Sequence, residues 1–186
     1  MNFLIAYGTT EGQTRKISQY VSARVKTQGH DATQIDASEP AIADVKLHDY
    51  DGVIVAASLH IGRFQAAVED FVRSRHETLN GMRTAFLSVS LSAASTDPDD
   101  IKGMRDCVQR FTSETAWKPG EIHHVSGAFR YTKYDFFKRW GMKLIASQKG
   151  VSTDASRDLE LTDWAGLERI TDAFIATVEK ARKQSA

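Results

Sequence analysis

The sequence predicts an α/β fold in which parallel β-strands alternate with helices. Residues 2–7 and 53–57 are short, continuous apolar runs, which are typical of strands buried on both faces of a parallel sheet. After such runs the apolar residues change to helical spacing, as at Val68, Phe71 and Val72. Strands that alternate with helices form right-handed crossovers, so we expect one parallel sheet covered by helices on both faces.

The first strand ends at Gly8, and a helix is expected over residues 14–28. Apolar residues recur along this helix at helical spacing, and Gly29 closes it. Residues 31–35 follow as a weak, partly polar strand, which we place at an edge of the sheet. The apolar run at 53–57 then belongs in the middle of the sheet.

The rest of the chain continues the alternation. Asp97 and Pro98 form a typical helix start, and Met104 and Val108 follow at helical spacing. The last helix is strongly amphipathic, with Asp163 expected in its first turn. We expect a helix over residues 65–76, a strand over 84–91, a helix from 97 onward, a weaker strand over 122–128 and a final helix over 162–182.

Length and composition favour one domain spanning residues 1–186, because the chain is long enough for one core and short for two. The 24 basic and 24 acidic side chains cancel, so no overall basic field indicates nucleic-acid binding. The six histidines show no metal-ligand spacing, and no metal is predicted. The single cysteine, Cys107, indicates a reducing compartment and is expected to be chemically inert.

No apolar stretch approaches the roughly 18 residues needed to span a bilayer. The first residues lack a basic region and run directly into a strand pattern, so they are not expected to be a signal peptide. We therefore expect a cytoplasmic protein.

The loop after the first strand is the first candidate ligand site. It precedes a helix, whose N-terminal N–H groups attract an anion. The lysine of a triphosphate-binding loop is missing, and Gly8 and Gly12 do not have dinucleotide-binding spacing. A single phosphomonoester remains, held by hydroxyls and amides; the alternative is that Thr10 or Thr14 only caps the helix. The candidate residues are Thr9, Thr10, Glu11, Gly12, Gln13 and Thr14.

This loop, T-x-[ED]-G-x-T directly after the first strand, resembles the FMN phosphate loop of the flavodoxins. The resemblance covers nearly the whole chain and implies a flavodoxin-like three-layer sandwich with strand order 2-1-3-4-5. It also implies that two further loops and a late glycine border the flavin ring. His60 and Phe64 are candidates to lie against the ring face; the alternatives are a solvated histidine and, preferred here, a core phenylalanine. The implied ring-binding residues are Ser58, Leu59, His60, Ile61, Gly62, Ser90, Leu91, Ser92, Ala93 and Gly127.

Residues 129–149 do not fit the alternation and are interpreted as a helical insertion before the last helix. Six basic and six aromatic residues stand there against one acidic residue, Asp135, so the local charge is +5. A basic amphipathic helix with aromatics suits a membrane surface or an amphipathic anionic ligand. The alternative is a helix packed on the sheet with a solvated basic face.

With this insertion, the chain resembles the bacterial quinone-dependent protoporphyrinogen oxidases. The resemblance implies FMN-dependent oxidation of protoporphyrinogen IX, with menaquinone or ubiquinone as acceptor, at the inner face of the cell membrane. Arg130, Tyr131 and Lys133 are candidates for substrate contact, and no catalytic base is identified. The resembling stretches are 12–15, 57–58 with Gly62, 88–91, 117–119, 127–131, 143–145 and 162–164.

Three other functions stay open at this point. One is a flavodoxin-type electron carrier, and another is an NAD(P)H:quinone reductase. The third is a membrane-associated scaffold without flavin. The sequence also leaves the oligomeric state open, with a homo-oligomer among the options.

Overall fold

The computed structural model describes residues 1–129 and 159–185. Its main sheet has five parallel strands in the order β2-β1-β3-β4-β5, which confirms the predicted topology. The polar strand β2 lies at an edge, as expected, and the apolar β1 and β3 lie inside. The strands are β1 (Asn2–Gly8), β2 (Asp31–Asp36), β3 (Gly52–Ser58), β4 (Arg83–Ser90) and β5 (Glu121–Ser126).

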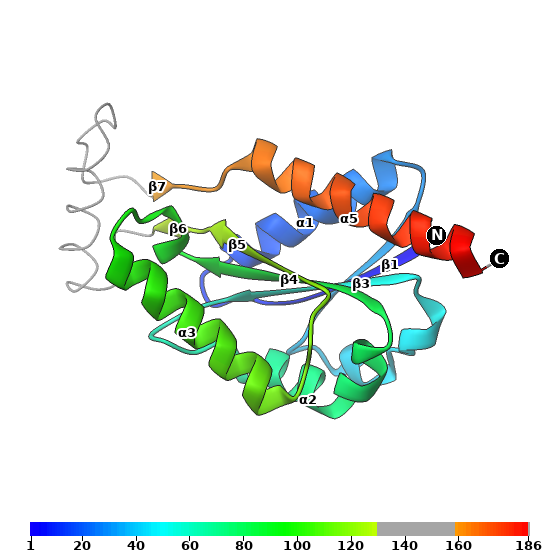
Figure 1. Ribbon diagram of the computed structural model, residues 1–186, viewed down its shortest axis with the longest axis horizontal. Helices are drawn as coiled ribbons and strands as arrows, with labels where there is room; N and C mark the ends of the chain where they lie inside the picture. Colours follow the sequence, from blue (N-terminus) through cyan, green and yellow to red (C-terminus); the bar gives the residue numbers. More distant parts are fainter. Residues whose placement is uncertain (130–158, 186) are drawn as a thin grey trace.

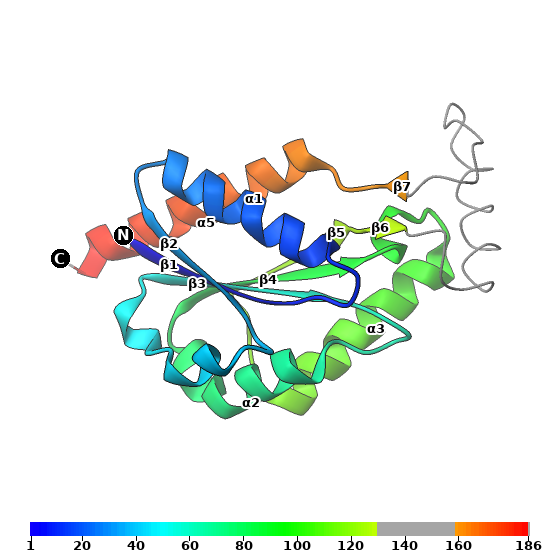
Figure 2. The ribbon, with the colours of Figure 1, turned by 180° about the vertical axis from the view of Figure 1, so that it is seen from behind.

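Helices cover both faces of this sheet, which gives the three layers of the predicted sandwich. In Figure 1 the helices α1 (Gln13–Thr27) and α5 (Trp164–Ser185) lie above the sheet. The helices α2 (Ala66–Asn80) and α3 (Pro98–Thr115) lie below it, and the view from behind shows the same arrangement (Figure 2). Short 3-10 turns are η1 (Pro40–Asp44), η2 (Leu47–Asp49) and η3 (Ser92–Ala94).

The sheet divides the core into two hydrophobic clusters because successive side chains on a strand point to opposite faces. Ile5 and Ile54 join the cluster beneath α1 and α5, while Leu4 and Val55 join the cluster beneath α2 and α3. Phe64 belongs to the second cluster, and its ring centroid lies 5.0 Å from that of Phe111. The core alternative for Phe64 is therefore confirmed.

Two boundaries differ from the sequence prediction. The strand expected over 122–128 ends at Ser126, and β6 (Ala128–Phe129) then pairs antiparallel with β7 (Leu159–Glu160). Asp163 lies before the last helix rather than in its first turn, because its carboxylate accepts a hydrogen bond from the Gly166 N–H at 2.9 Å and caps the helix.

The predicted insertion at 129–149 lies, apart from Phe129, outside the described residues. The first described part of the chain ends at β6, and the second begins at β7. Within the described parts, no helix combines the length and apolar character that crossing a membrane requires.

Candidate functional site

The predicted ligand loops follow the carboxyl ends of parallel strands and therefore meet at one edge of the sheet. Gly8 at the end of β1 pairs with Ala57, next to the end of β3. At the other side, Ser90 at the end of β4 pairs with Ser126 at the end of β5. The structure thus brings together the loops that the sequence places far apart.

The loop between β1 and α1 turns at Gly12, whose φ of 93° is the left-handed conformation that glycine adopts without a steric penalty. Its N–H donates to the Thr9 hydroxyl at 2.9 Å, which closes the loop. Gly12 is also the N-cap residue of α1, and no side chain caps this helix. The alternative that Thr10 or Thr14 only caps the helix is therefore wrong.

The Thr14 side chain is fully buried, yet its hydroxyl has no hydrogen-bond partner among the described residues. A buried hydroxyl without a partner is costly. It lies in the first turn of α1, where the helix also leaves its first N–H groups without intrahelical acceptors. Hydroxyl and amide donors at a helix N-terminus are the donor set that binds one phosphate.

Arg15 is the first cationic residue after this loop, and its side chain contacts Tyr7 and Asp36. Its Nε donates to the Tyr7 hydroxyl at 3.2 Å, and its Nη2 lies 3.6 Å from the buried Asp36 carboxylate. The hydrogen bond to Tyr7 is the main reason that the pKa of Arg15 is raised. The loop over residues 9–14 itself contains no lysine or arginine.

The loop after β3 forms a tight turn at its tip. The N–H of His60 donates to the Arg63 carbonyl at 2.8 Å, and the N–H of Arg63 donates back at 3.1 Å. Ile61 and Gly62 between them have positive φ values of 49° and 74°, the pattern of a type I′ turn. Ile61 is 82% exposed at the tip, so an apolar side chain is presented to the surroundings of the site.

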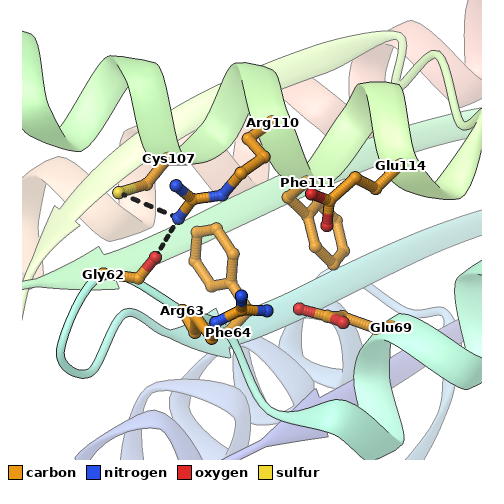
Figure 3. Close-up of a pocket in the computed structure, with 8 residues that line it drawn as sticks. All are labelled: Gly62, Arg63, Phe64, Glu69, Cys107, Arg110, Phe111 and Glu114. Carbon is orange, nitrogen blue, oxygen red and sulfur yellow. Dashed lines mark hydrogen bonds between the residues drawn. The ribbon is translucent and has the colours of Figure 1, made fainter.

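This turn is held from both sides. On the sheet side, the Leu59 N–H donates to the Val89 carbonyl at 2.7 Å. On the other side, the Arg110 guanidinium of α3 donates to the Gly62 carbonyl across a small recess (Figure 3). Arg63, Phe64 and Glu69 face Arg110 across that recess, beside the loop.

The loops that follow β4 and β5 are joined by backbone hydrogen bonds. The Ser90 carbonyl accepts from the Gly127 N–H at 3.0 Å, and the Gly127 carbonyl accepts from the Leu161 N–H at 3.1 Å. The Ser90 hydroxyl accepts from the Ala93 N–H at 3.2 Å and shapes the turn η3, which contains Ser92 and Ala93. Leu91 connects β4 to η3, so the residues predicted after β4 lie beside Gly127.

Two polar residues that the sequence reasoning did not assign connect these loops. The Gln65 amide bridges Thr10 and Ser58. The Thr162 hydroxyl accepts from Gln13 Nε2 at 2.9 Å and donates to the Ser126 carbonyl at 2.7 Å. Thr162 stands in one of the stretches that carry the family resemblance, whereas nothing in the sequence around Gln65 marks it.

The three predicted substrate-binding residues, Arg130, Tyr131 and Lys133, lie outside the described residues. Among residues 1–129 and 159–185, no group of three or more histidine, cysteine, aspartate or glutamate side chains could hold a metal ion. The described site therefore consists of the loop after β1 and the loops that follow β3, β4 and β5.

Comparisons with known proteins agree with this geometry. The family model described as a flavodoxin domain matches residues 4–156. The protoporphyrinogen IX dehydrogenase [quinone] of Escherichia coli K12 is 31% identical over 88% of this chain and 89% of its own length. A protein of the same name from Leishmania major is 30% identical over 93% of this chain and 74% of its own.

Among solved structures, the Streptococcus pneumonia TIGR4 flavodoxin aligns with a TM-score of 0.58. The alignment covers 95% of this chain and 99% of that one at 15% identity, which supports the fold. The flavodoxin domain implies flavin binding. The chain belongs to the flavodoxin-domain family and, within it, to the family of the quinone-dependent protoporphyrinogen IX dehydrogenases.

Proposed function

We propose that the protein binds FMN and oxidises protoporphyrinogen IX to protoporphyrin IX, with a respiratory quinone as electron acceptor. The family relationship along most of the chain is the observation that carries this proposal. The proposed reaction is one step of haem biosynthesis. The gathering of four loops at one edge of the sheet supplies a place for the cofactor.

The residues of the phosphate loop fit FMN. The buried, unpartnered Thr14 hydroxyl and the uncapped start of α1 provide donors for one phosphate. The missing lysine argues against a longer polyphosphate. The loops at 58–62 and 90–93 and Gly127 would border the flavin ring with backbone N–H and carbonyl groups.

The protein's own contribution is to bind and orient the reactants. FMN, when bound, supplies the redox chemistry by accepting electrons from the porphyrinogen. Phe64 follows the ring loop (residues 58–62) and packs in the core against Phe86 and Phe111, which anchors the end of that loop. Arg130 and Lys133 are our candidates to bind the substrate propionates, because cationic side chains form charge-assisted hydrogen bonds with carboxylates. Tyr131 is the candidate for contact with the apolar macrocycle.

Anaerobic turnover tests the reaction. The purified protein, loaded with FMN, is mixed with protoporphyrinogen IX and a soluble menaquinone or ubiquinone analogue, and protoporphyrin fluorescence is followed. We expect no rise without FMN-loaded protein, and a rise beyond the amount that the bound FMN alone can oxidise only when quinone is present. No porphyrin formation, alongside rapid NAD(P)H oxidation by the same preparation, would identify an NAD(P)H:quinone reductase instead.

We also propose that residues 129–149 bring the protein to the inner face of the cell membrane, where the quinone is dissolved. The support is the charge of +5 and the interleaved aromatics of this segment. Vesicle co-sedimentation tests it with Lys138→Glu/Arg139→Glu/Lys143→Glu in the full chain. We expect lost binding to anionic vesicles and retained FMN affinity. Unchanged vesicle binding contradicts a membrane role for these charges.

A further inference from the structure

Gln65 lies immediately before α2, with its side chain between the phosphate loop and the ring loop. Its Oε1 accepts a hydrogen bond from the Ser58 N–H at 3.1 Å. Its Nε2 donates to the Thr10 hydroxyl at 2.9 Å and to the Ser58 carbonyl at 3.0 Å. The Ser58 hydroxyl lies within hydrogen-bond distance of the same Nε2. One amide therefore contacts two loops that are far apart in the sequence.

The backbone fixes which way this amide faces. The Ser58 N–H can only donate, so it requires the carbonyl oxygen of Gln65 opposite it. The NH₂ group consequently faces the oxygens of Thr10 and Ser58. The end of β1 limits the space: a Cβ atom on Gly8 would lie 3.0 Å from Gln65 Oε1. The amide thus has one arrangement that satisfies its partners.

This arrangement determines what the two hydroxyls can do. A hydroxyl has one proton to donate and can accept two hydrogen bonds. The two protons on Gln65 Nε2 face three oxygens, so the carbonyl and the hydroxyl of Ser58 share one of them while the Thr10 hydroxyl accepts the other. The proton of each hydroxyl is then directed away from Gln65. Thr10 is exposed and Ser58 is half-buried, and both stand at the sheet edge where the loops gather.

We propose that Gln65 is a positioning residue for FMN. It holds the phosphate loop and the ring loop at a fixed separation and leaves the Thr10 and Ser58 hydroxyls as donors toward the cofactor. This inference rests on the FMN binding proposed above. It gives Gln65 a role in cofactor affinity that acts through Thr10, beyond fastening the start of α2.

The dissociation constant of FMN, measured by flavin fluorescence quenching on apoprotein, tests the role. Gln65→Met removes the amide at similar length, and we expect the dissociation constant to rise about tenfold. Gln65→Glu keeps an acceptor for the Ser58 N–H but cannot donate when ionised, and it places a negative charge near the phosphate. We expect a rise of about a hundredfold for that variant. Gln109→Met, at an exposed position on α3, is the matched control and leaves FMN affinity unchanged.

A double-mutant cycle with Thr10→Val separates positioning from general support of the fold. If Gln65 acts through the Thr10 hydroxyl, the double variant Thr10→Val/Gln65→Met should have an FMN dissociation constant little higher than that of whichever single variant binds FMN more weakly. A double variant whose loss equals the product of the two single losses overturns the proposal. Wild-type FMN affinity in Gln65→Met also overturns the proposal. If Gln65→Met fails to fold, the surface variant Thr10→Val takes its place, and wild-type FMN affinity in that variant overturns the proposal.

The outcomes also separate this inference from the proposed function. A wild-type apoprotein that does not bind FMN contradicts the proposed function and removes the basis for both. Wild-type protein that binds FMN, with unchanged affinity in the Gln65 variants, contradicts the positioning role alone. Porphyrinogen turnover enters neither comparison.

Discussion

Arg24 on α1 forms a two-point ion pair with Asp172 on α5. The Nε–Oδ1 and Nη2–Oδ2 distances are both 2.7 Å, and Glu168 lies 3.1 Å from the same guanidinium. The pair joins the two helices on one face of the sheet (Figure 2). Since α1 begins in the phosphate loop and α5 begins just after Thr162, this contact helps to hold two parts of the site together.

The hydrogen bonds from Arg24 lower the pKa of Asp172 below its ordinary value. A carboxylate with a lowered folded-state pKa stabilises the protein above the unfolded-state pKa, and this contribution is lost as the pH falls through the folded-state value. We therefore expect Asp172→Asn to lower the Tm at pH 7 by roughly 2 °C or less, because the pair is partly exposed. The difference from wild type should shrink as the pH falls below about 4, the ordinary pKa of an aspartate.

Calorimetry across this pH range checks the expectation. Asp70→Asn is the control, because its pair with Arg73 is more exposed and should change the Tm less. An Asp172→Asn deficit that grows on acidification contradicts the assigned sign.

Replacement of Thr14 by valine should separate stability from cofactor binding. The Thr14 hydroxyl is buried without a partner, so its removal leaves the Tm of the apoprotein unchanged or slightly higher. In the proposed FMN site the same change removes a phosphate donor, so the FMN dissociation constant should rise about 10–100-fold. Thr112→Val on α3, where the hydroxyl donates to the Val108 carbonyl at 3.1 Å, should leave FMN affinity unaltered. A destabilised apoprotein with normal FMN affinity contradicts the assignment of Thr14.

Ile61 combines an unfavourable backbone conformation with an exposed apolar side chain. Its φ of 49° is costly for a β-branched residue, and asparagine adopts this conformation more readily. We expect Ile61→Asn to raise the free energy of unfolding by about 1 kcal/mol. If Ile61 contacts an apolar reactant, kcat/KM for the porphyrinogen or the quinone falls about fivefold at the same time. Denaturant unfolding and turnover measure the two effects, and full activity in the stabilised variant contradicts a role in contact.

Gly8 is required by close packing at the end of β1. A Cβ atom there would lie 2.5 Å from Val68 Cγ2. We expect Gly8→Ala to lower the free energy of unfolding by about 1–3 kcal/mol. Val68→Ala makes room for the added methyl, so the double variant should be less destabilised than the sum of the two single changes.

Gly103 supplies the matched control. A Cβ atom on this residue of α3 meets nothing within 4 Å, so Gly103→Ala should stabilise the helix by about 0.5–1 kcal/mol. Equal effects at Gly8 and Gly103 in chemical denaturation would contradict the packing argument.

The order of the elements could be predicted from the sequence because each depends on a local pattern. The apolar run that became β3 and the Asp97-Pro98 start of α3 are examples; the Asp97 carboxylate accepts from the Asp99 N–H at 2.9 Å. The end of β5 could not be predicted, because the Gly127 carbonyl accepts a hydrogen bond from the Leu161 N–H, while its own N–H still donates to Ser90 on β4. Those partners are distant in sequence, and the local alternation continues through the break.

The same limit applies to the site. The loop proposed to bind the phosphate could be singled out because its six residues are consecutive. The bridge from Gln65 to Thr10 joins residues 55 positions apart, and no pattern around Gln65 indicates it. The unpartnered Thr14 hydroxyl depends on burial beneath the helix, which the letters of the loop do not reveal. The substrate candidates at 130–133 lie outside the described residues and stay a prediction.

The short antiparallel pair of β6 and β7 determines where this chain can be shortened or rebuilt. Phe129 and Leu159 are direct neighbours in that pair, so the two ends of the intervening stretch are already side by side. A two-residue turn could join them without moving any strand of the main sheet. The pair is thus a splice point at which the intervening stretch can be shortened or exchanged while the five-stranded core stays unchanged.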